Sequence, residues 1–261
     1  MFPKLFEIGP LTVHTYGFLL AVAFLAGLAM ASWRARTEGI EGNRVWDLGV
    51  LMILSGLVGA KFILIVTEWD YYSANPADLF SLATLRAAGV WYGGLLAALG
   101  ATAVYLWRSG LPGWKVADIF APSVALGHAI GRLGCFFAGC DYGRPTARPW
   151  GVTFTSDYAN ETVGVPLNIP LHPTQLYESG AEALILVFLL LWYPRKKFDG
   201  QIVCLYLLLY GCVRFFIEFL RGDSERGFVF GSNLSTSQFV SLLVVPAALF
   251  FWWRRARTAA A

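Results

Sequence analysis

The chain has 261 residues, of which 57% are hydrophobic and 14% charged, with ten tryptophans, a mean hydropathy of +0.57 and a formal net charge of +3. Soluble domains are usually about 45–50% apolar, so this composition excludes a soluble globular protein and indicates an integral membrane protein. The basic residues flank apolar runs and form no basic helix, which leaves no case for nucleic-acid binding.

Seven apolar runs are long enough to cross a bilayer as helices, because a helical span needs about 20 mostly apolar residues. They lie at about 15–33, 47–67, 89–107, 118–139, 174–193, 201–220 and 237–253. All connectors are short except residues 141–173. We therefore expect one all-α membrane domain, 1–261, built as a seven-helix bundle with a small cap formed mainly by the loop 141–173.

The basic residues in the connectors predict the orientation of the chain. Eleven lie in segments that would share one side with the C-terminus, and six, including Arg86 and Arg226, lie on the other side. By the positive-inside rule the C-terminus is cytoplasmic and the N-terminus is outside. Arg34 and Arg36 follow the first span and are the wrong flank for a cleaved signal peptide.

Three basic residues, Lys61, Arg132 and Arg214, fall within the predicted spans. Ionisable residues at membrane depth are expensive and mark functional sites by default. His128 precedes Arg132 by four residues and shares its helix face. Simpler interpretations also exist, since Lys61 can extend to the membrane surface and Arg214 can pair with Glu218 on its own helix. Tyr210 continues the stripe of Arg214 and Glu218.

The segment Gly131–Gly143 ends an apolar run, carries Arg132 and breaks into a glycine-rich polar exit. Arginine stays charged when buried and binds phosphate oxygens in a bidentate way, so these arginines suit a phosphate ester in the membrane. Gly93 and Gly94 open the third span, where glycines at a helix N-terminus favour anion binding or close helix packing. Tyr16, which opens the first span, is also typical of an interfacial aromatic residue.

Cysteines and histidines give no pattern for a metal, a cofactor or a disulfide framework. The four cysteines are Cys135, Cys140, Cys204 and Cys212. They fall within or at the end of predicted spans, which favours small buried thiols over a disulfide framework, with a redox pair of Cys135 and Cys140 as an alternative. The three histidines lack a neighbouring His/Cys spacing, so we expect no metal and no cofactor.

Residues 141–173 are proline-rich, and Trp150–Phe154 has strand character. A connector of this length is usually a functional lid or a linker, and its aromatic content favours a folded cap. It leads to Thr174, which we expect to cap the fifth span.

Several segments in order carry a resemblance to a known family. They are Tyr16–Gly17, Tyr92–Gly94, Gly131–Gly143, His172–Glu178 and Tyr210–Arg221. Through them the chain resembles the prolipoprotein diacylglyceryl transferases of the bacterial inner membrane. The resemblance implies transfer of diacylglyceryl from phosphatidylglycerol to the lipobox cysteine of a preprolipoprotein signal peptide, releasing glycerol phosphate on the periplasmic side. It also implies a multi-pass inner-membrane enzyme with a lipid-binding central cavity.

The resemblance, together with the charge and helix position of Lys61 and His128, assigns expected roles to particular residues. The positions that match important family residues are Tyr16, Arg132, Gly143, Tyr210, Arg214 and Glu218. The expected catalytic residues are Arg132, Arg214, Tyr92, His128 and Tyr16. The residues expected to bind phosphatidylglycerol are Arg132, Arg214, Lys61, Tyr210, Glu218, Gly93, Gly94 and Gly143.

The chain departs from better-known family members at the group that would act as base. Where they carry a histidine before the paired glycines, this chain has Tyr92, a poor base near its ordinary pKa of about 10. In the signature, this chain has Cys135 and Ala138 at the two positions where other members carry asparagine. It has Cys140 where they carry an acid, and Asp141 follows directly. We therefore hypothesise that His128 supplies the base function.

Two alternatives remain open. One is a paralogue of this family with another lipid donor or a restricted set of acceptors. The other is a lipid or anion transporter with the same buried arginines, although the two halves of the chain show no repeat of the kind that transporters often have. We expect a monomer in contact with membrane lipid.

Overall fold

The computed structural model describes residues 2–8, 11–81, 84, 89–223, 227–229, 231 and 234–260. Arg86 and Arg226, which entered the charge count used to orient the chain, lie outside these residues. The described chain is helical, with two small two-stranded sheets.

Six helices of the described chain are long and apolar enough to cross a membrane. They are α1 (Thr15–Thr37), α2 (Gly42–Thr67), α6 (Gly113–Ala138), α8 (Thr174–Trp192) with η2 (Tyr193–Arg195), α9 (Gln201–Ile217) with η3 (Glu218–Leu220), and α10 (Thr236–Ala260). Each matches a predicted span, with ends that differ by a few residues. The prediction of an α-helical membrane protein is confirmed.

The seventh expected span, 89–107, forms the helix α5 (Trp91–Ser109), which is not among these six. The helix α5 begins with two aromatic residues, Trp91 and Tyr92, followed by Gly93 and Gly94. Arg108 lies in its last turn. Glycine, tryptophan, tyrosine and arginine each lower the mean hydropathy of this helix. Composition therefore supports six spans in the described chain rather than seven.

The chain divides into two compact units, each described by itself. The first comprises Met1–Ala31 and Ala117–Ala261, and the second comprises Ser32–Val116. The boundaries fall within α1 and α6, and the first unit holds both arginines that were predicted within spans.

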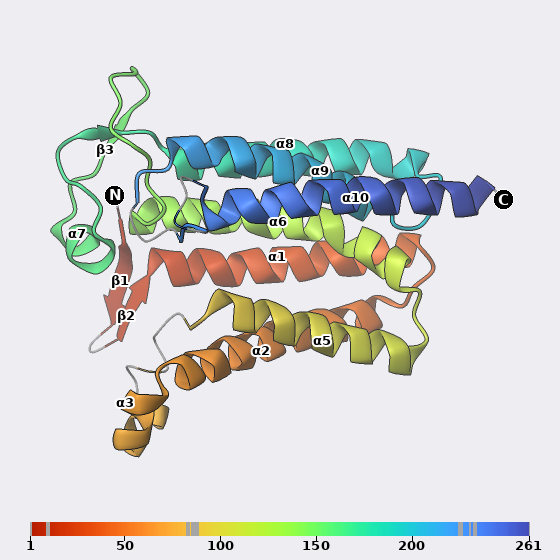
Figure 1. The fold of residues 1–261 in the computed structure, drawn as a ribbon, viewed down its shortest axis with the longest axis horizontal. Coiled ribbons are helices and arrows are strands. Elements are labelled where there is room, and N and C mark those ends of the chain that lie inside the picture. The colour runs from red at the N-terminus through yellow and green to blue at the C-terminus, as the bar shows by residue number, and fades with distance from the viewer. Residues whose placement is uncertain are drawn as a thin grey trace. The chain divides into compact units, whose positions relative to one another are not determined.

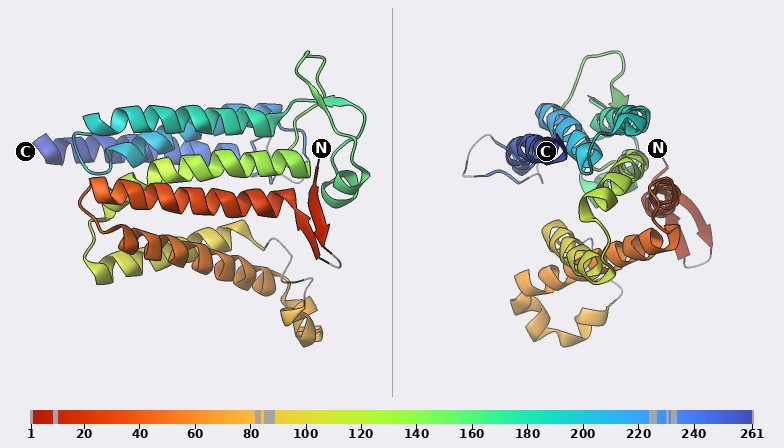
Figure 2. Two further views of the ribbon diagram at one scale, coloured as in Figure 1. Left: turned by 180° about the vertical axis from the view of Figure 1, so that it is seen from behind. Right: turned by 90° about the vertical axis from the view of Figure 1, so that its right-hand side faces the viewer.

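The first unit is a bundle in which α1, α6, α8, α9 and α10 run lengthwise beside one another (Figure 1) and cluster when viewed end-on (Figure 2). Small residues bring α1 and α6 close together: a Cβ on Gly27 would lie 3.3 Å from the Ser123 carbonyl oxygen, and one on Gly127 would lie 3.4 Å from that of Ala23. Such small-residue contacts are a common basis of helix packing in membranes, where apolar burial gives little driving force.

The core of the first unit lies where α6, α8 and α9 meet. Its buried residues are Ala121, Ala125, Ile185, Leu189, Tyr193, Ile202 and Tyr206. Toward the other end of these helices the core becomes polar, because Glu178 and Glu182 on α8 are both fully buried. Buried charges require partners, and the partners of these two acids define the functional site.

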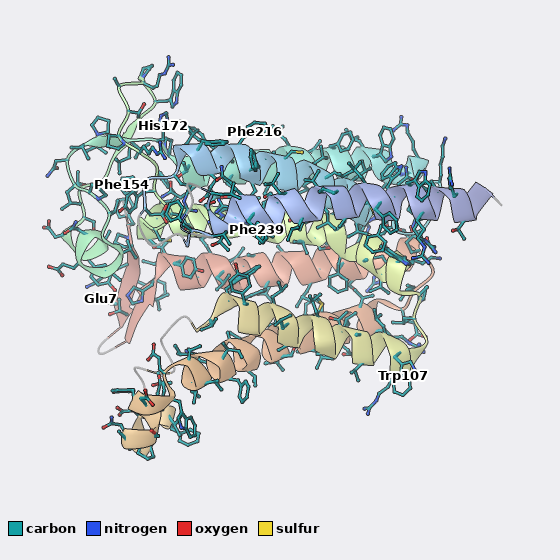
Figure 3. All side chains as sticks on the ribbon, viewed as in Figure 1. Glu7, Trp107, Phe154, His172, Phe216 and Phe239 are labelled. Carbon is teal, nitrogen blue, oxygen red and sulfur yellow. The ribbon has the colours of Figure 1, made fainter. Side chains whose placement is uncertain are left out.

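The connector 141–173 is a folded insertion with a small core of its own. It contains β3 (Val152–Thr153), α7 (Asp157–Val163) and β4 (Pro170–Leu171), and β3 pairs with β4 in an antiparallel sheet. Phe154, fully buried, lies inside the insertion (Figure 3), with its ring 6.1 Å from that of Phe136 on α6. The predicted strand character is confirmed at β3.

A hairpin precedes α1. Its strands β1 (Lys4–Ile8) and β2 (Leu11–His14) pair antiparallel. His14 Nε2 lies 2.8 Å from the hydroxyl of Tyr158 on α7, so the hairpin is tied to the insertion.

The second unit is built on α2 and α5. Along the chain, α3 (Trp69–Ala74) and η1 (Pro76–Phe80) lie between these two helices. Gly59 and Gly93 face each other, and a Cβ on Gly59 would lie 2.5 Å from the Gly93 carbonyl oxygen. The lack of side chains at these two positions therefore lets α2 and α5 approach closely.

Gly143 joins the insertion to the end of α9. Its backbone bridges to Arg221, and its N–H donates to the His172 carbonyl at 3.1 Å. A Cβ there would lie 2.4 Å from the same carbonyl oxygen. Since overpacking costs about 1–3 kcal/mol, we expect Gly143→Ala to lower the melting temperature in detergent by several degrees.

Gly180→Ala is the matched control for this substitution. A Cβ on Gly180 meets no atom within 4 Å, and alanine favours a helix over glycine by up to about 1 kcal/mol. Equal melting temperatures for the two variants would contradict a steric role for Gly143.

Candidate functional site: a buried arginine and carboxylate cluster

Arg132 on α6 contacts groups from two other segments and from its own helix. Its Nη1 pairs with Asp141 in the turn after α6, and its Nη2 lies 3.2 Å from Oε1 of Glu178 on α8. Its Nε donates to Nε2 of His128 at 3.2 Å. The side chain is 15% exposed, so opposite charges hold it in a place that an unpaired cation would not occupy. The predicted shared face of His128 and Arg132 is confirmed.

Arg214 on α9 has partners on three segments. Its Nη2 lies 2.9 Å from Oε2 of Glu218 and donates to Oγ of Ser237 on α10 at 2.9 Å. Its Nη1 lies 3.3 Å from Oε2 of Glu178. The intrahelical pair with Glu218 therefore exists, but it does not account for the contact with Glu178.

Glu178 links the two arginines. Its Oε1 faces Arg132 and its Oε2 faces Arg214, while the hydroxyl of Tyr210 donates to Oε1 at 3.3 Å. Glu178 is 1% exposed. One carboxylate thus fixes guanidinium groups from α6 and α9 relative to each other, which long flexible side chains do not achieve by themselves.

His128 is held from both ring nitrogens. Its Nδ1 lies 2.7 Å from Oε1 of Glu182, which also accepts from the hydroxyl of Tyr206 at 3.4 Å. Its Nε2 lies 3.5 Å from Glu178, but Arg132 Nε is nearer and can only donate. These partners assign the tautomer in which Nδ1 carries the proton and Nε2 accepts.

Asp141 lies between two arginines. Its Oδ2 pairs with Arg132, and its Oδ1 lies 2.6 Å from Nη2 of Arg221, which also bonds Asp223 at 2.6 Å. Burial alone would raise the pKa of the Asp141 carboxyl, but the charges of Arg132 and Arg221 outweigh it and hold this pKa below its usual range.

The turn that carries Asp141 is fixed from α8. Thr174, which we expected to cap α8, does not do so: its Oγ1 donates to the Asp141 carbonyl at 2.7 Å, because the chain enters α8 through Pro173 and the turn lies within reach. Gln175 Nε2 donates to the Cys140 carbonyl at 2.7 Å. The first turn of α8 therefore positions the carboxylate that pairs with Arg132.

Tyr16 lies beside the same end of α6. It is 41% exposed, and a Cβ on Gly134 would lie 3.2 Å from its Cδ2. Its ring therefore packs against α6 at Gly134, two residues after Arg132.

The remaining predicted residues belong to the second unit. Lys61 Nζ donates to the Thr84 carbonyl at 2.6 Å. Tyr92 is 47% exposed, and its ring meets that of Trp91 edge-on at 5.1 Å. The N–H groups of Gly93 and Gly94 both donate to the Val90 carbonyl. Gly93 and Gly94 face the backbone of α2, so the absence of side chains there permits close helix packing.

A polar cavity of about 320 Å³ opens beside the arginines of the first unit. Its walls are formed by Arg132, Asp141, Arg214, Arg221, Asp223, Gly227, Thr236 and Ser237. Three guanidinium groups line this small space together with the hydroxyl groups of Thr236 and Ser237. This arrangement suits an anion with several oxygens, such as a phosphate ester.

A larger groove of about 750 Å³ lies in the second unit. It is lined mainly by apolar residues with Arg44 and Arg108 at its edge, and it contains none of the predicted catalytic residues. The chemistry of the side chains, rather than volume, therefore favours the smaller cavity as the candidate functional site.

Four charged residues of the cluster had no predicted site role: Asp141, Glu178, Glu182 and Arg221. Glu178 and Arg221 were named only as ends of segments that carry the resemblance. Glu178 and Glu182 lie four residues apart within an apolar run, and intramembrane carboxylates carry the same functional signal as intramembrane arginines. The sequence reasoning weighed only the basic residues in this way. Counting the acids would have found both glutamates.

The fold and the site together define a membrane protein with a polar cavity lined by buried arginines. Such a site suits an enzyme or a carrier that acts on a phosphate-bearing lipid. The sequence matches the prolipoprotein diacylglyceryl transferase family over residues 3–254, and the chain belongs to this family. It is accordingly a transferase.

Three relatives show how far the similarity extends. The phosphatidylglycerol–prolipoprotein diacylglyceryl transferase of Clostridium tetani is 39% identical over 254 residues, covering 96% of each chain. The protein of the same name from Finegoldia magna is 37% identical and covers 94% of this chain and 92% of its own. That of Synechococcus elongatus is 35% identical and covers 93% and 83%, respectively.

Proposed function

We propose that this protein transfers the sn-1,2-diacylglyceryl group of phosphatidylglycerol to the thiol of a lipobox cysteine, and that the reaction takes place at the arginine-lined cavity. The observation that carries this proposal is the convergence of Arg132, Arg214 and Arg221 on one cavity of about 320 Å³. Family membership and the names of the relatives support the choice of substrates.

Arg132 and Arg214 act as the phosphate clamp. The substrate thiolate attacks the glycerol carbon that bears the phosphate, a C–S bond forms, and the C–O bond breaks with its electron pair moving onto the phosphate oxygen. Charge on that oxygen grows in the transition state, where fixed guanidinium groups stabilise it most effectively. Glu178 keeps both groups in place before the lipid arrives.

His128 is the proposed base, as its position beside Arg132 suggests. Glu182 holds Nδ1, which leaves Nε2 as the accepting nitrogen. A free thiol with a pKa near about 8.5 is mostly protonated at neutral pH, so a base accelerates its attack. His128 must exchange its hydrogen bond from Arg132 for the thiol proton, and lipid binding, which engages Arg132, favours this exchange.

The other predicted residues keep supporting roles in the proposal. Tyr16, Tyr210, Glu218 and Gly143 surround the clamp in the first unit. From the second unit, we propose that Lys61, Tyr92, Gly93 and Gly94 contact the lipid.

The proposed setting is the bacterial cytoplasmic (inner) membrane, with a monomer of one membrane domain. We propose that α5 crosses the bilayer with the six more apolar helices, giving seven spans, a periplasmic N-terminus and a cytoplasmic C-terminus. Basic residues in the last turns of α1, α5 and α10 support this orientation. The insertion 141–173 is then a periplasmic cap, and the active site faces the periplasm.

Purified protein mixed with phosphatidylglycerol and a lipobox peptide tests the proposal. A mass gain of one diacylglyceryl group on the peptide is the expected result. Gain only with another anionic lipid would identify a paralogue with a different donor. Lipid binding without any modification of the peptide would contradict the proposal and favour a transporter.

We expect His128→Ala to abolish transfer while phosphatidylglycerol still binds, because the arginine clamp remains paired with Glu178. Peptide mass and lipid binding, measured on the same preparation, separate the two effects. General bases typically contribute about 10²–10⁴-fold. Full activity of the variant would overturn the assignment of His128, whereas loss of lipid binding would show that His128 positions Arg132.

A further inference from the structure

Two thiols and a carboxylate converge at the end of α6, next to the clamp. Cys135 Sγ, Cys140 Sγ and a carboxylate oxygen of Asp141 all lie within 4.8 Å of one another. Both cysteines are free, and Cys135 is buried. The sequence did not predict this group, because a spacing of five residues followed by an aspartate is not a familiar metal motif.

The local backbone accounts for the convergence. The N–H of Gly139 donates to the Cys135 carbonyl at 2.9 Å and ends the helix. Gly139 and Asp141 have positive φ angles of 86° and 59°, so the chain reverses around Cys140. Its thiol then lies back over α6, 3.7 Å from the Cys135 carbonyl.

These donors have the chemistry of a zinc site, and they lie close enough together to share one ion. Tetrahedral Zn²⁺ with Zn–S bonds of about 2.3 Å separates two sulfurs by about 3.8 Å, so small side-chain rotations bring the cluster to bonding distances. Thiolates select thiophilic ions such as Zn²⁺. Asp141 can still bind an ion while Arg132 and Arg221 hold it, because a carboxylate offers about four lone-pair sites.

We propose that Cys135, Cys140 and Asp141 bind one Zn²⁺-type cation, and that the open fourth position takes the thiol of the substrate cysteine. This inference rests on the proposed function for the identity of that thiol. Catalytic zinc sites keep such an open position next to three protein ligands. The site would activate the nucleophile in a chain that lacks the family histidine at Tyr92.

The charges around the cluster are compatible with an ion. A divalent cation bound to two thiolates adds no net charge to the site. Arg132, whose Nη1 lies 3.9 Å from Cys135 Sγ, therefore faces sulfur that carries negative charge. The pairing of Arg132 with Asp141 need not break.

The step balances without a redox partner. The substrate thiol binds the ion, which favours its deprotonation, and gives its proton to Nε2 of His128, the base of the proposed function. The bound sulfur then attacks the glycerol carbon, the C–S bond forms, and the C–O bond breaks with its electron pair leaving on glycerol phosphate. The thioether is a weaker ligand than the thiolate, so the product dissociates and the ion stays.

Cobalt provides the test, because Co²⁺ occupies zinc sites and gives a thiolate-to-metal absorption band. Reduced protein in detergent, titrated with Co²⁺ alone under anaerobic conditions, should bind one ion per chain and show this band. Zn²⁺ should displace it. A lipobox peptide should then intensify the band, whereas the same peptide with serine at the lipobox cysteine should not.

Variants identify the ligands. Cys135→Ser and Cys140→Ser should lose the cobalt band, whereas Cys204→Ser and Cys212→Ser, which change the two cysteines on α9, should keep it. A wild-type measurement guards against misfolded variants: Zn²⁺ should protect Cys135 and Cys140, but not Cys212, from iodoacetamide as read by mass spectrometry. Absence of stoichiometric binding, or a band that Cys135→Ser and Cys140→Ser retain, would overturn the inference.

The transfer assay separates this inference from the proposed function. Removal of the ion by a chelator should reduce transfer at least tenfold, and added Zn²⁺ should restore it. Full transfer by protein shown to contain no metal would overturn the zinc site and leave the proposed function intact. One-to-one metal binding that responds to the lipobox thiol, without any transfer, would instead reject the proposed function.

Discussion

Replacing Arg132 with alanine is expected to lower the transfer rate by about 10³-fold or more. Fixed cationic or hydrogen-bonding groups that stabilise a developing oxyanion or phosphoryl charge contribute about 10²–10⁵ in rate. Arg132 also holds Asp141, Glu178 and His128 together. Solvent cannot replace it, because its side chain is only 15% exposed. Peptide lipidation under single-turnover conditions measures the effect.

Two further variants define what Arg132 contributes. Arg132→Lys keeps the charge but loses the planar fork that contacts Asp141 and Glu178 at the same time, so we expect only partial recovery. Arg148→Ala is the matched control, because Arg148 lies on the insertion and is exposed. A rate for Arg132→Ala equal to that of Arg148→Ala would reject the clamp.

Arg214→Ala should reduce transfer comparably, since Arg214 approaches the same cavity from α9. The substitution would remove one of the two arginines that contact Glu178, and it would remove the arginine that pairs with Glu218. Measurement of lipid binding beside turnover shows whether the two arginines act on the ground state or mainly on the transition state.

The helices were predictable because each depends on a local property, the length of an apolar run. Six predicted spans correspond to helices with ends that differ by a few residues. The stripe of Arg214 and Glu218 and the shared face of His128 and Arg132 were also predictable, since helical spacing alone fixes them. The span at α5 differs because its paired glycines, which face the backbone of α2, add little hydropathy to the helix.

The partners of the arginines were not predictable in the same way. The contact of Glu178 with both Arg132 and Arg214 depends on how α6, α8 and α9 pack, and no spacing along one helix encodes it. The convergence of Cys135, Cys140 and Asp141 depends on a turn with two positive φ angles. In the sequence, only Gly139 indicates this turn, because glycine commonly adopts a positive φ. Asp141 gives no such indication, since residues other than glycine are uncommon in the left-handed region.

Replacing Glu178 with glutamine is expected to separate binding from turnover. The variant keeps the shape of the side chain but removes the one negative charge between two guanidinium groups. Removing one partner of a buried ion pair costs about 3–5 kcal/mol, although Asp141 and Glu218 still pair the two arginines and preserve the fold. We therefore expect a lower melting temperature in detergent and a folded protein.

The kinetic signature of Glu178→Gln distinguishes positioning from simple damage. With less negative charge in the cavity, the anionic lipid should bind as tightly as before or more tightly. Turnover should fall by about 10²-fold, because the guanidinium groups are no longer aligned for the transition state. Glu161→Gln, an exposed change on α7, is the control. If lipid affinity fell with unchanged turnover, Glu178 would instead contribute to ground-state binding, and its proposed role in aligning the clamp would be wrong.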